Sequence, residues 1–407
     1  MNVPFPHAPP ASFRARTPVL LASAVLLLLL GGLATAPGEA RAQSLLSAGG
    51  LGTPVDATDA RSRALGGASV GLTGAGVFPS DPASAAAVSL PGIAATMEAN
   101  VTSPEDGVES GGTRFPSLAI LFPTRGYVFT GTLVGVLSQE WNAAVVRDID
   151  LGDASVQARD SFEGRGGVSA ARFGVARPIG ESLQVGAAFG TYIGSMERQF
   201  IRELSPADVG PGVEPFGVRG VWRARGLNGV VGANWRLDDL LRVGATLVVG
   251  GDLELNPTGE TDASTQTIPM PTELRLGASG LLLPGLTVAV ETSRADWSDA
   301  GRALGNEGGP GVAWSFGGGA EWNRITILGR PLPVAAGYRQ RDLPFSFLGE
   351  SATERAFTAG VGAHLVDATE STPLGRIHLS LETGTRSTDS WDENFLRTTL
   401  SLRVSGR

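Results

Sequence analysis

The sequence has 407 residues, with 32 basic and 40 acidic side chains, a formal net charge of −8, and no cysteine. An acidic chain without a basic tract makes nucleic acid an improbable partner, and the lack of cysteine excludes disulfides and thiolate metal sites. All 32 basic residues are arginine and only three histidines occur, so we expect neither a bound metal nor a cofactor.

The amino terminus, residues 1–42, has the order of a secretory signal peptide. Arg14 and Arg16 precede the apolar run 19–34, and the small-residue pattern "ARA" ends at Ala42. This order predicts cleavage after Ala42. The alternative is an uncleaved anchor, but the apolar run is shorter than the roughly 20 residues that a spanning helix needs.

Residues 43–92 form a second segment, which differs in kind from the rest of the chain. From residue 60 to residue 92 it is rich in Gly, Ala and Ser and shows no strand-length alternation of polarity. Small residues allow close backbone packing. We therefore expect this segment to act as a hatch, or plug, inside the structure formed by residues 93–407.

Segments of alternating polarity recur throughout residues 93–407. In "GRIHLSLETGTR", residues 375–386, Leu379 and Leu381 alternate with Ser380 and Glu382, and a strand would place the two sets on opposite faces. The rhythm predicts about 14 strands, at residues 93–102, 115–122, 126–138, 165–177, 182–198, 219–236, 240–255, 271–283, 286–297, 312–324, 332–341, 354–366, 376–386 and 394–404.

The connections between these strands alternate in length. Tight turns occur at "RPIGES", "RLDDLL", "LLPGL" and "GRPLP", whereas longer loops are expected at residues 199–218, 256–270, 298–311 and 342–353. An even number of strands with short turns at one end and long loops at the other is typical of a bacterial outer-membrane barrel. We predict an all-β, transmembrane antiparallel barrel with a lumenal plug; a secreted sandwich or propeller is the alternative.

Several stretches resemble the FadL-type family of outer-membrane transporters for long-chain fatty acids and hydrocarbons. "RALGGASVGLTGAG" followed by "DPAS" is similar to the family's amino-terminal hatch, with Asp81-Pro82-Ala83 in place of its Asn-Pro-Ala motif. Residues 268–298 resemble its Pro-led strand pair, and residues 332–345 its Gly-Tyr strand. "LSLETGTRSTDSWDENFLRTTLSLRVS" resembles its last hairpin.

This resemblance implies a monomeric 14-stranded barrel, plugged by its hatch, that releases apolar molecules through a kinked wall strand. The matching strand is "GYVFTGTLVGVLS", in which Gly126, Gly131 and Gly135 interrupt the wall. Glycine inside a strand often marks a bulge or a bend. A lateral exit and simple packing against the plug both explain these glycines.

Ligand-binding residues are expected in the two longest central loops. These loops carry an apolar load that fits either a ligand groove or packing against the barrel rim: Phe200, Ile201, Leu204, Phe216, Trp222, Ile268 and Met270. A carboxylate head group would bind an inward arginine, for which Arg339 is a candidate beside Arg172, Arg242, Arg275 and Arg397. The same arginines could instead pair with Glu273, Glu291 or Glu382.

Transport of hydrophobic or amphipathic small molecules across the outer membrane is thus the first functional hypothesis, with membrane lipid and lipopolysaccharide as the surroundings. A barrel that serves as a secretion or assembly partner, as in type IX secretion, is the alternative. A lipid hydrolase is a remote one, because Ser69 in a G-x-S-x-G pattern follows no buried strand. We expect no catalytic residues.

Overall fold

The computed structural model describes residues 44–55, 59–72, 78–104, 110–151, 154–205, 214–259, 264–306, 311–327, 330–369 and 372–406. The expected signal peptide, residues 1–42, lies outside this part of the chain. Within the described ranges, no helix is long and apolar enough to cross a membrane.

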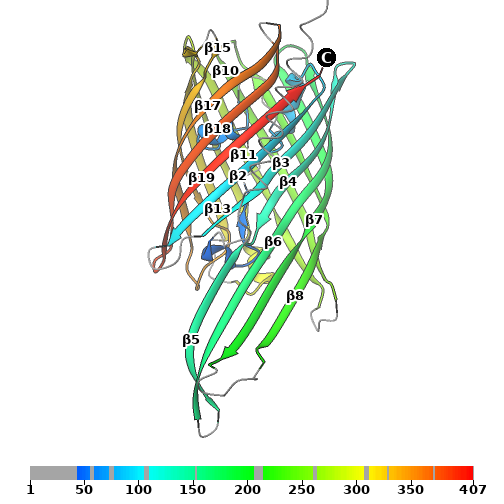
Figure 1. Ribbon diagram of the computed structural model, residues 1–407. Coiled ribbons are helices and arrows are strands. Elements are labelled where there is room, and N and C mark those ends of the chain that lie inside the picture. The colour runs from blue at the N-terminus through cyan, green and yellow to red at the C-terminus, as the bar shows by residue number, and fades with distance from the viewer. Residues whose placement is uncertain are drawn as a thin grey trace, which may run out of the picture. The chain divides into compact units, whose positions relative to one another are not determined.

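Most of the chain forms one antiparallel sheet (Figure 1). Its wall strands are β2 (Gly92–Pro104), β3 (Ser110–Thr124), β4 (Tyr127–Ser138), β5 (Trp141–Leu151), β6 (Ala154–Ile179), β7 (Leu183–Leu204), β8 (Phe216–Arg225), β9 (Leu227–Arg236), β10 (Leu241–Pro257), β11 (Gln266–Leu283), β12 (Leu286–Asp296), β13 (Val312–Trp322), β16 (Val334–Asp342), β17 (Thr353–Thr369), β18 (Thr372–Ser387) and β19 (Asp392–Ser405). A separate hairpin pairs β14 (Thr326–Ile327) with β15 (Arg330–Pro331).

The sheet closes because the last strand, β19, pairs with the first wall strand, β2. β5 continues the path of β4 beside β6, and β8 and β9 together form one wall strand between β7 and β10. Counted in this way the wall has 14 strands, which confirms the predicted barrel. Closure leaves backbone N–H and C=O groups paired with neighbouring strands, as a lipid environment requires.

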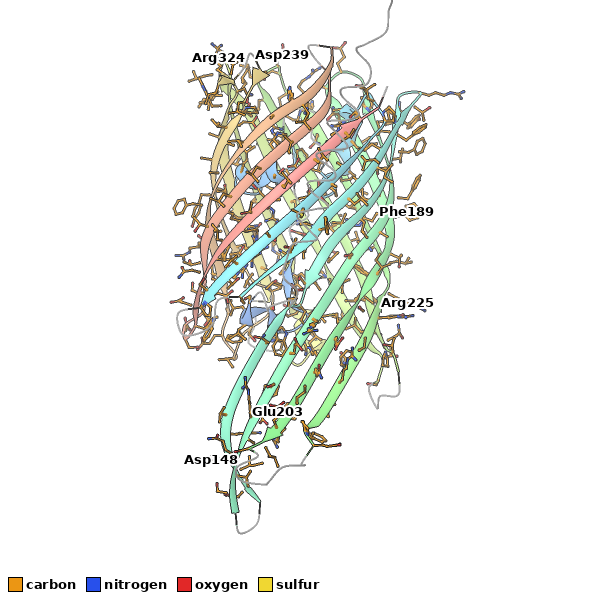
Figure 2. All side chains as sticks on the ribbon, viewed as in Figure 1. Asp148, Phe189, Glu203, Arg225, Asp239 and Arg324 are labelled. Carbon is orange, nitrogen blue, oxygen red and sulfur yellow. The ribbon has the colours of Figure 1, made fainter. Side chains whose placement is uncertain are left out.

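The two faces of the wall follow the predicted alternation. In β18, Leu379 is 45% exposed on the outer face, whereas its neighbour Ser380 is 1% exposed on the inner face. Phe189 projects outward from the wall in Figure 2 and is 71% exposed. An apolar outer face and a polar, filled interior are what a barrel in lipid needs.

The largest departure from the predicted elements lies between residues 139 and 222. A loop was expected at 199–218, but β7 continues to Leu204 and β8 begins at Phe216, and β5 was not predicted at all. Figure 1 shows β5, β6, β7 and β8 reaching past the other strands at the end opposite the carboxyl terminus. We call this part the extension. Backbone hydrogen bonding continues in the extension because each strand has a neighbouring strand there. Apolar residues that were expected in a loop therefore lie in paired strands.

A short helix, α4 (Ser298–Ala303), occupies part of the loop expected at 298–311. Trp297 and Ala300 of this region are buried among residues of the barrel interior. The loop is therefore folded inward over the strands and is not a free connection.

The residues before β2 form short elements, η1 (Leu45–Ala48), β1 (Thr53–Pro54), α2 (Ala60–Ala64) and η2 (Pro82–Ala87). We call the described part of residues 44–91 the amino-terminal segment. α2 packs against β16–β19, whereas η2 packs against β4, β6, β7 and β9. Because these strands lie on different sides of the closed wall and offer their inner faces, the segment lies within the barrel.

Candidate functional site

Glycines of the wall bring the amino-terminal segment against the strands. A Cβ atom at Gly317 would collide with the carbonyl oxygen of Gly66, and one at Gly277 with that of Val70. Gly66 itself has a φ of +71°, a backbone conformation that residues other than glycine rarely adopt. Small residues on both partners therefore allow the backbone contact that the sequence predicted.

The Asp81-Pro82-Ala83 motif starts η2 and fastens it to the wall. Asp81 is the N-cap: its Oδ1 accepts a hydrogen bond from the backbone N–H of Ala83 at 3.1 Å, and Pro82 occupies the first turn. Its Oδ2 accepts from Nδ2 of Asn234 in β9 at 2.6 Å. Burial raises the pKa of Asp81 to about 6, against the opposing effect of these hydrogen bonds.

Ser69, the residue of the G-x-S-x-G pattern, is held by a wall carboxylate. Glu291 Oε2 accepts hydrogen bonds from the backbone N–H groups of Ser69 and Val70 at 2.6 and 2.8 Å, and from the Ser69 hydroxyl at 3.1 Å. The same hydroxyl lies 3.1 Å from that of Ser80. These contacts give Ser69 a structural role in seating the segment.

A buried network of arginines and glutamates fills the interior beside β2, β3 and β16–β19. Arg63 of α2 joins it through Glu98 at 2.6 Å and Glu382 at 3.3 Å. Arg339 bonds both Glu354 at 2.7 Å and Glu382 at 2.5 Å. We call this set the charge network; its described members are Arg63, Arg114, Arg339, Arg341, Arg386, Arg397, Glu98, Glu354, Glu382 and Glu393.

An apolar cluster occupies the interior on the side of β6–β8 and β10–β12. Ile268 is fully buried there, Met270 is 8% exposed, and Trp222 packs against the cluster's edge. Trp297 and Phe345 join it from two loops, with ring centroids 5.4 Å apart. The sequence placed the first three residues near a ligand but missed the last two, although each lies in a segment that resembles the FadL-type family.

A cavity of about 180 Å³ lies between the charge network, the apolar cluster and the amino-terminal segment. Met270 and Arg339, two of the residues predicted to contact a ligand, line it. Its wall combines apolar side chains with charged ones, among them Val55, Val134, Trp297, Trp314, Phe316, Arg172, Arg275, Arg341, Glu273 and Glu291. A mixed lining of this kind suits a ligand that has an apolar body and a polar group.

The remaining residues of the predicted groove lie in the extension. The ring of Phe200 lies 5.0 Å from that of Phe162 and 6.4 Å from that of Phe216, centroid to centroid. Leu204 follows on the same strand face, whereas Ile201 lies on the opposite face because side chains alternate. The seven apolar residues therefore fall into two groups. In the extension Phe216 is exposed and Phe200, Ile201 and Leu204 are half-buried, whereas Trp222, Ile268 and Met270 belong to the apolar cluster or pack against it.

The wall is interrupted between β3 and β4. Their pairing ends at Ser117↔Val134, although β3 continues back to Ser110 beside β2 and β4 continues to Ser138 beside β6. The next residue of β3, Pro116, has no N–H to donate, and the register shifts on its other side as well. We call the unpaired stretch, between residues 110–116 and 135–138, the wall gap.

The amino-terminal segment takes the place of β3 along the end of β4. β1 pairs with β4 through Thr53↔Ser138, and the Val55 N–H donates to the carbonyl of Val136 at 2.9 Å. The β4–β6 register also shifts between Gly135 and Leu137. Backbone pairing is thus transferred from the wall to the segment at this position.

The three glycines predicted to mark an exit lie in different surroundings. Gly126 precedes β4 in the β3–β4 turn, with φ +81°, so it belongs to a turn and not to the strand interior. Gly131 faces outward, and a Cβ there would meet nothing within 4 Å. Gly135 lines the cavity beside the wall gap, where a Cβ would lie 2.9 Å from Val55 Cγ1.

Most inward arginines pair with carboxylates, which was one of the two readings of the sequence. Arg397 bonds Glu382 at 3.1 Å, and Arg275 bonds Glu273 at 3.0 Å. Arg172 differs, since its described hydrogen bond runs from Nε to the amide oxygen of Asn228, at 2.5 Å. Arg242 is partly buried on the inner face of β10, within the electrostatic influence of Asp81.

Comparison with known proteins supports the fold at low sequence identity. A family model described as BamG matches residues 21–214, and no curated protein matches the sequence. The toluene transporter TbuX of Ralstonia pickettii has a similar structure, with 17% identity, a TM-score of 0.59, and coverage of 87% of this chain and 99% of that one.

Two further solved structures agree. The toluene transporter TodX of P. putida has 16% identity and a TM-score of 0.56, with 87% of this chain and 99% of that one covered. A FadL homologue of Pseudomonas aeruginosa has 11% identity and a TM-score of 0.54, with 88% and 99% covered. The closed 14-strand wall and these likenesses together show that the chain has the fold of the FadL-type outer-membrane barrels.

Proposed function

We propose that this protein carries hydrophobic or amphipathic small molecules passively across the outer membrane. The observation that carries the proposal is the position of the cavity: Val134, Gly135 and Val136 line it, and the β3–β4 pairing ends at these residues. A ligand in the cavity therefore lies beside a place where two neighbouring wall strands separate. The similar structures named as toluene transporters support the same class of function.

The extension is the candidate surface for capturing the solute from outside. Phe216 is 62% exposed and Val218 57%, next to the rings of Phe162 and Phe200. Exposed aromatic surface of this kind desolvates an apolar solute, which is worth roughly 0.8 kcal/mol per buried CH₂. The solute would then pass along the inner face towards Trp222 and the apolar cluster.

The wall gap is the candidate exit, and the amino-terminal segment is the candidate plug. Hydrogen bonds from β1 to the end of β4 would have to loosen for the gap to open, because β1 occupies the edge that β3 leaves free. We also propose that residues 1–42 are removed on export, so that the plug begins near the amino terminus of the mature chain.

Substitution at two glycines of β4 tests the exit. Gly135→Trp combined with Val55→Ala places an indole in the wall gap, with room made on the plug side, whereas Gly131→Trp places one against lipid. We expect the first to reduce toluene uptake into proteoliposomes at least tenfold and the second to leave it unchanged. Heat-modifiable migration verifies that both fold. Equal uptake by the two folded variants would contradict the lateral exit.

A role as an assembly or secretion partner is the second candidate, and the BamG match favours keeping it. That match covers the amino-terminal segment and β2–β7, and its description names no transported molecule. A deletion strain tests the choice. Loss of solute uptake with normal levels of other outer-membrane proteins supports transport, whereas normal uptake with depleted outer-membrane proteins supports the partner role.

A further inference from the structure

Arg172 lines the cavity with its cationic group held in place by a neutral partner. It lies on β6 directly opposite Gly190 of β7, which in turn lies opposite Asn228 of β9. Because Gly190 has no side chain, the arginine crosses over it, and Nε donates to Asn228 Oδ1 at 2.5 Å. This hydrogen bond uses Nε and leaves the two terminal nitrogens as further donors on a residue that lines the cavity.

Charge balance distinguishes Arg172 from the other arginines of the cavity. Arg275, Arg339 and Arg341 each form an ion pair with a glutamate. Among the described residues, no ion pair includes Arg172, although its exposed fraction is only 9%. Glu273 lines the same cavity and acts on Arg172 electrostatically, but its ion pair is with Arg275. A buried cation without an ion pair of its own is costly, so a ligand that supplied a negative charge would be favoured at this position.

Asn228 adds a second polar group without a partner. Its Oδ1 is occupied by Arg172, which leaves Nδ2 as the remaining donor, and Nδ2 is buried without a hydrogen-bond partner in the described structure. Asn228 is 6% exposed. Asn228 holds the arginine from behind and does not itself line the cavity, so the donors that face a ligand belong to Arg172. The acceptor that matches them best is a carboxylate, which can take both Nη donors of an arginine.

The rest of the cavity limits the size and shape of the ligand. Met270, Trp297 and Phe316 provide apolar walls, and the volume is about 180 Å³. A cavity of about 150 Å³ is enough to hold benzene. One ring with a carboxylate, or a short aliphatic acid of similar bulk, therefore fits within the cavity, whereas a long alkyl chain would extend out of its open side.

We infer that the cavity selects small monocarboxylates with an apolar body, of about the size of benzoate, and that Arg172 is the residue that recognises the carboxylate. This inference rests on the proposed transport function and names its substrate class. It differs from the long-chain class implied by the sequence resemblance, and from a neutral hydrocarbon, which would leave Arg172 without an ion-pair partner among the described residues.

The test uses the purified full chain, with benzoate, toluene and palmitate as ligands at neutral pH. Isothermal titration calorimetry in detergent measures binding, and proteoliposomes measure uptake. We expect Arg172→Met to weaken benzoate binding about 10- to 100-fold, the range for one charge-assisted hydrogen-bonded contact, and to change toluene binding less than about twofold. Arg172→Lys, which keeps the charge, should retain part of the benzoate affinity.

Arg165→Met is the matched control, because Arg165 lies on the same strand but is exposed on the opposite face. It should bind benzoate like the unmodified chain. Heat-modifiable migration shows whether each variant is folded, and Arg172→Lys keeps the test decisive if Arg172→Met does not fold.

The possible outcomes separate the inference from the function on which it rests. Toluene binding equal to benzoate binding, or stronger binding of palmitate, would overturn the substrate class while leaving transport intact. Unchanged benzoate affinity in folded Arg172→Met would remove Arg172 as the recognition residue. If none of the three ligands enters proteoliposomes, the transport function itself fails.

Discussion

Charged contacts fill one side of the barrel interior and apolar contacts fill the other. On the side of β2, β3 and β16–β19, Arg63 joins the amino-terminal segment to the charge network, and on the side of β6–β8 and β10–β12, Trp297 and Phe345 close loops onto an apolar cluster. Ion pairs need a particular geometry, whereas apolar side chains can repack. We therefore expect the first side to fix the amino-terminal segment, the candidate plug, and the second to move when a solute enters.

The largest expected effect comes from removing a carboxylate of the charge network. Glu382 is 2% exposed and bonds Arg63, Arg339 and Arg397. Glu382→Gln would leave three buried arginines without the negative charge that they share. We therefore expect the free energy of unfolding to decrease by about 3–5 kcal/mol. Urea titrations of folding into bilayers measure it. A loss below about 1 kcal/mol would mean that the network does not fix the plug.

On the apolar side, Phe345→Ala should act mainly on access to the cavity. Phe345 is 3% exposed and packs on Trp297 and on Gly50 of the amino-terminal segment. We expect the free energy of unfolding to decrease by about 3 kcal/mol. This is at the low end for truncation of a buried phenylalanine, because the neighbouring loops can collapse into the cavity that the ring leaves. Single-channel conductance should rise. Unchanged conductance in the folded variant would contradict a movable apolar side, and Phe345→Leu serves as the milder control.

A smaller effect, dependent on pH, is expected at Asp81, where the plug meets the wall. Its pKa is about 6 in the folded protein and 3.8 as an ordinary aspartate, so the folded state holds the proton more tightly. The resulting stability is fully present below about pH 4 and is lost as pH rises through about 6, a change on the order of 3 kcal/mol at most.

Asp81→Asn, which introduces the residue of the FadL-type Asn-Pro-Ala motif, should flatten this dependence. Asn234 can rotate its amide so that its oxygen accepts from the new side chain. Unfolding midpoints at pH 4, 5, 6 and 7 provide the measurement. A variant whose midpoint falls with pH as steeply as the unmodified chain would exclude Asp81 as the titrating group.

The smallest effect is expected from an ion pair outside the interior. Arg219 and Glu197 form a bidentate ion pair in the extension, and the arginine side chain is 60% exposed. Solvent screens such pairs, so Arg219→Met should leave the unfolding midpoint unchanged within error. A shift as large as that of Glu382→Gln would remove the distinction between buried and exposed charge on which the comparison depends.

The sequence by itself determined the barrel. Period-two alternation, as at Leu379 and Ser380, reports which side chain meets lipid and which meets the interior, and this constraint acts on each strand locally. The number of wall strands followed from the same local patterns, as did the expectation that small residues let the amino-terminal segment pack closely against the wall. The ends of the strands could not be predicted from these local patterns. The pairing of β5–β8 beyond the barrel depends on neighbouring strands, which the sequence of a single strand does not specify.

Tertiary structure alone decided the site. Arg172, Gly190 and Asn228 lie far apart in the chain and meet only because strand register places them in one row. From sequence, Arg172 was one of five inward arginines, and the structure distinguishes it because Arg275, Arg339 and Arg397 pair with glutamates while Arg242 does not line the cavity. The wall gap likewise depends on where β3 stops pairing with β4 and β1 replaces it, since hydrogen bonding between distant segments is settled by the closed fold.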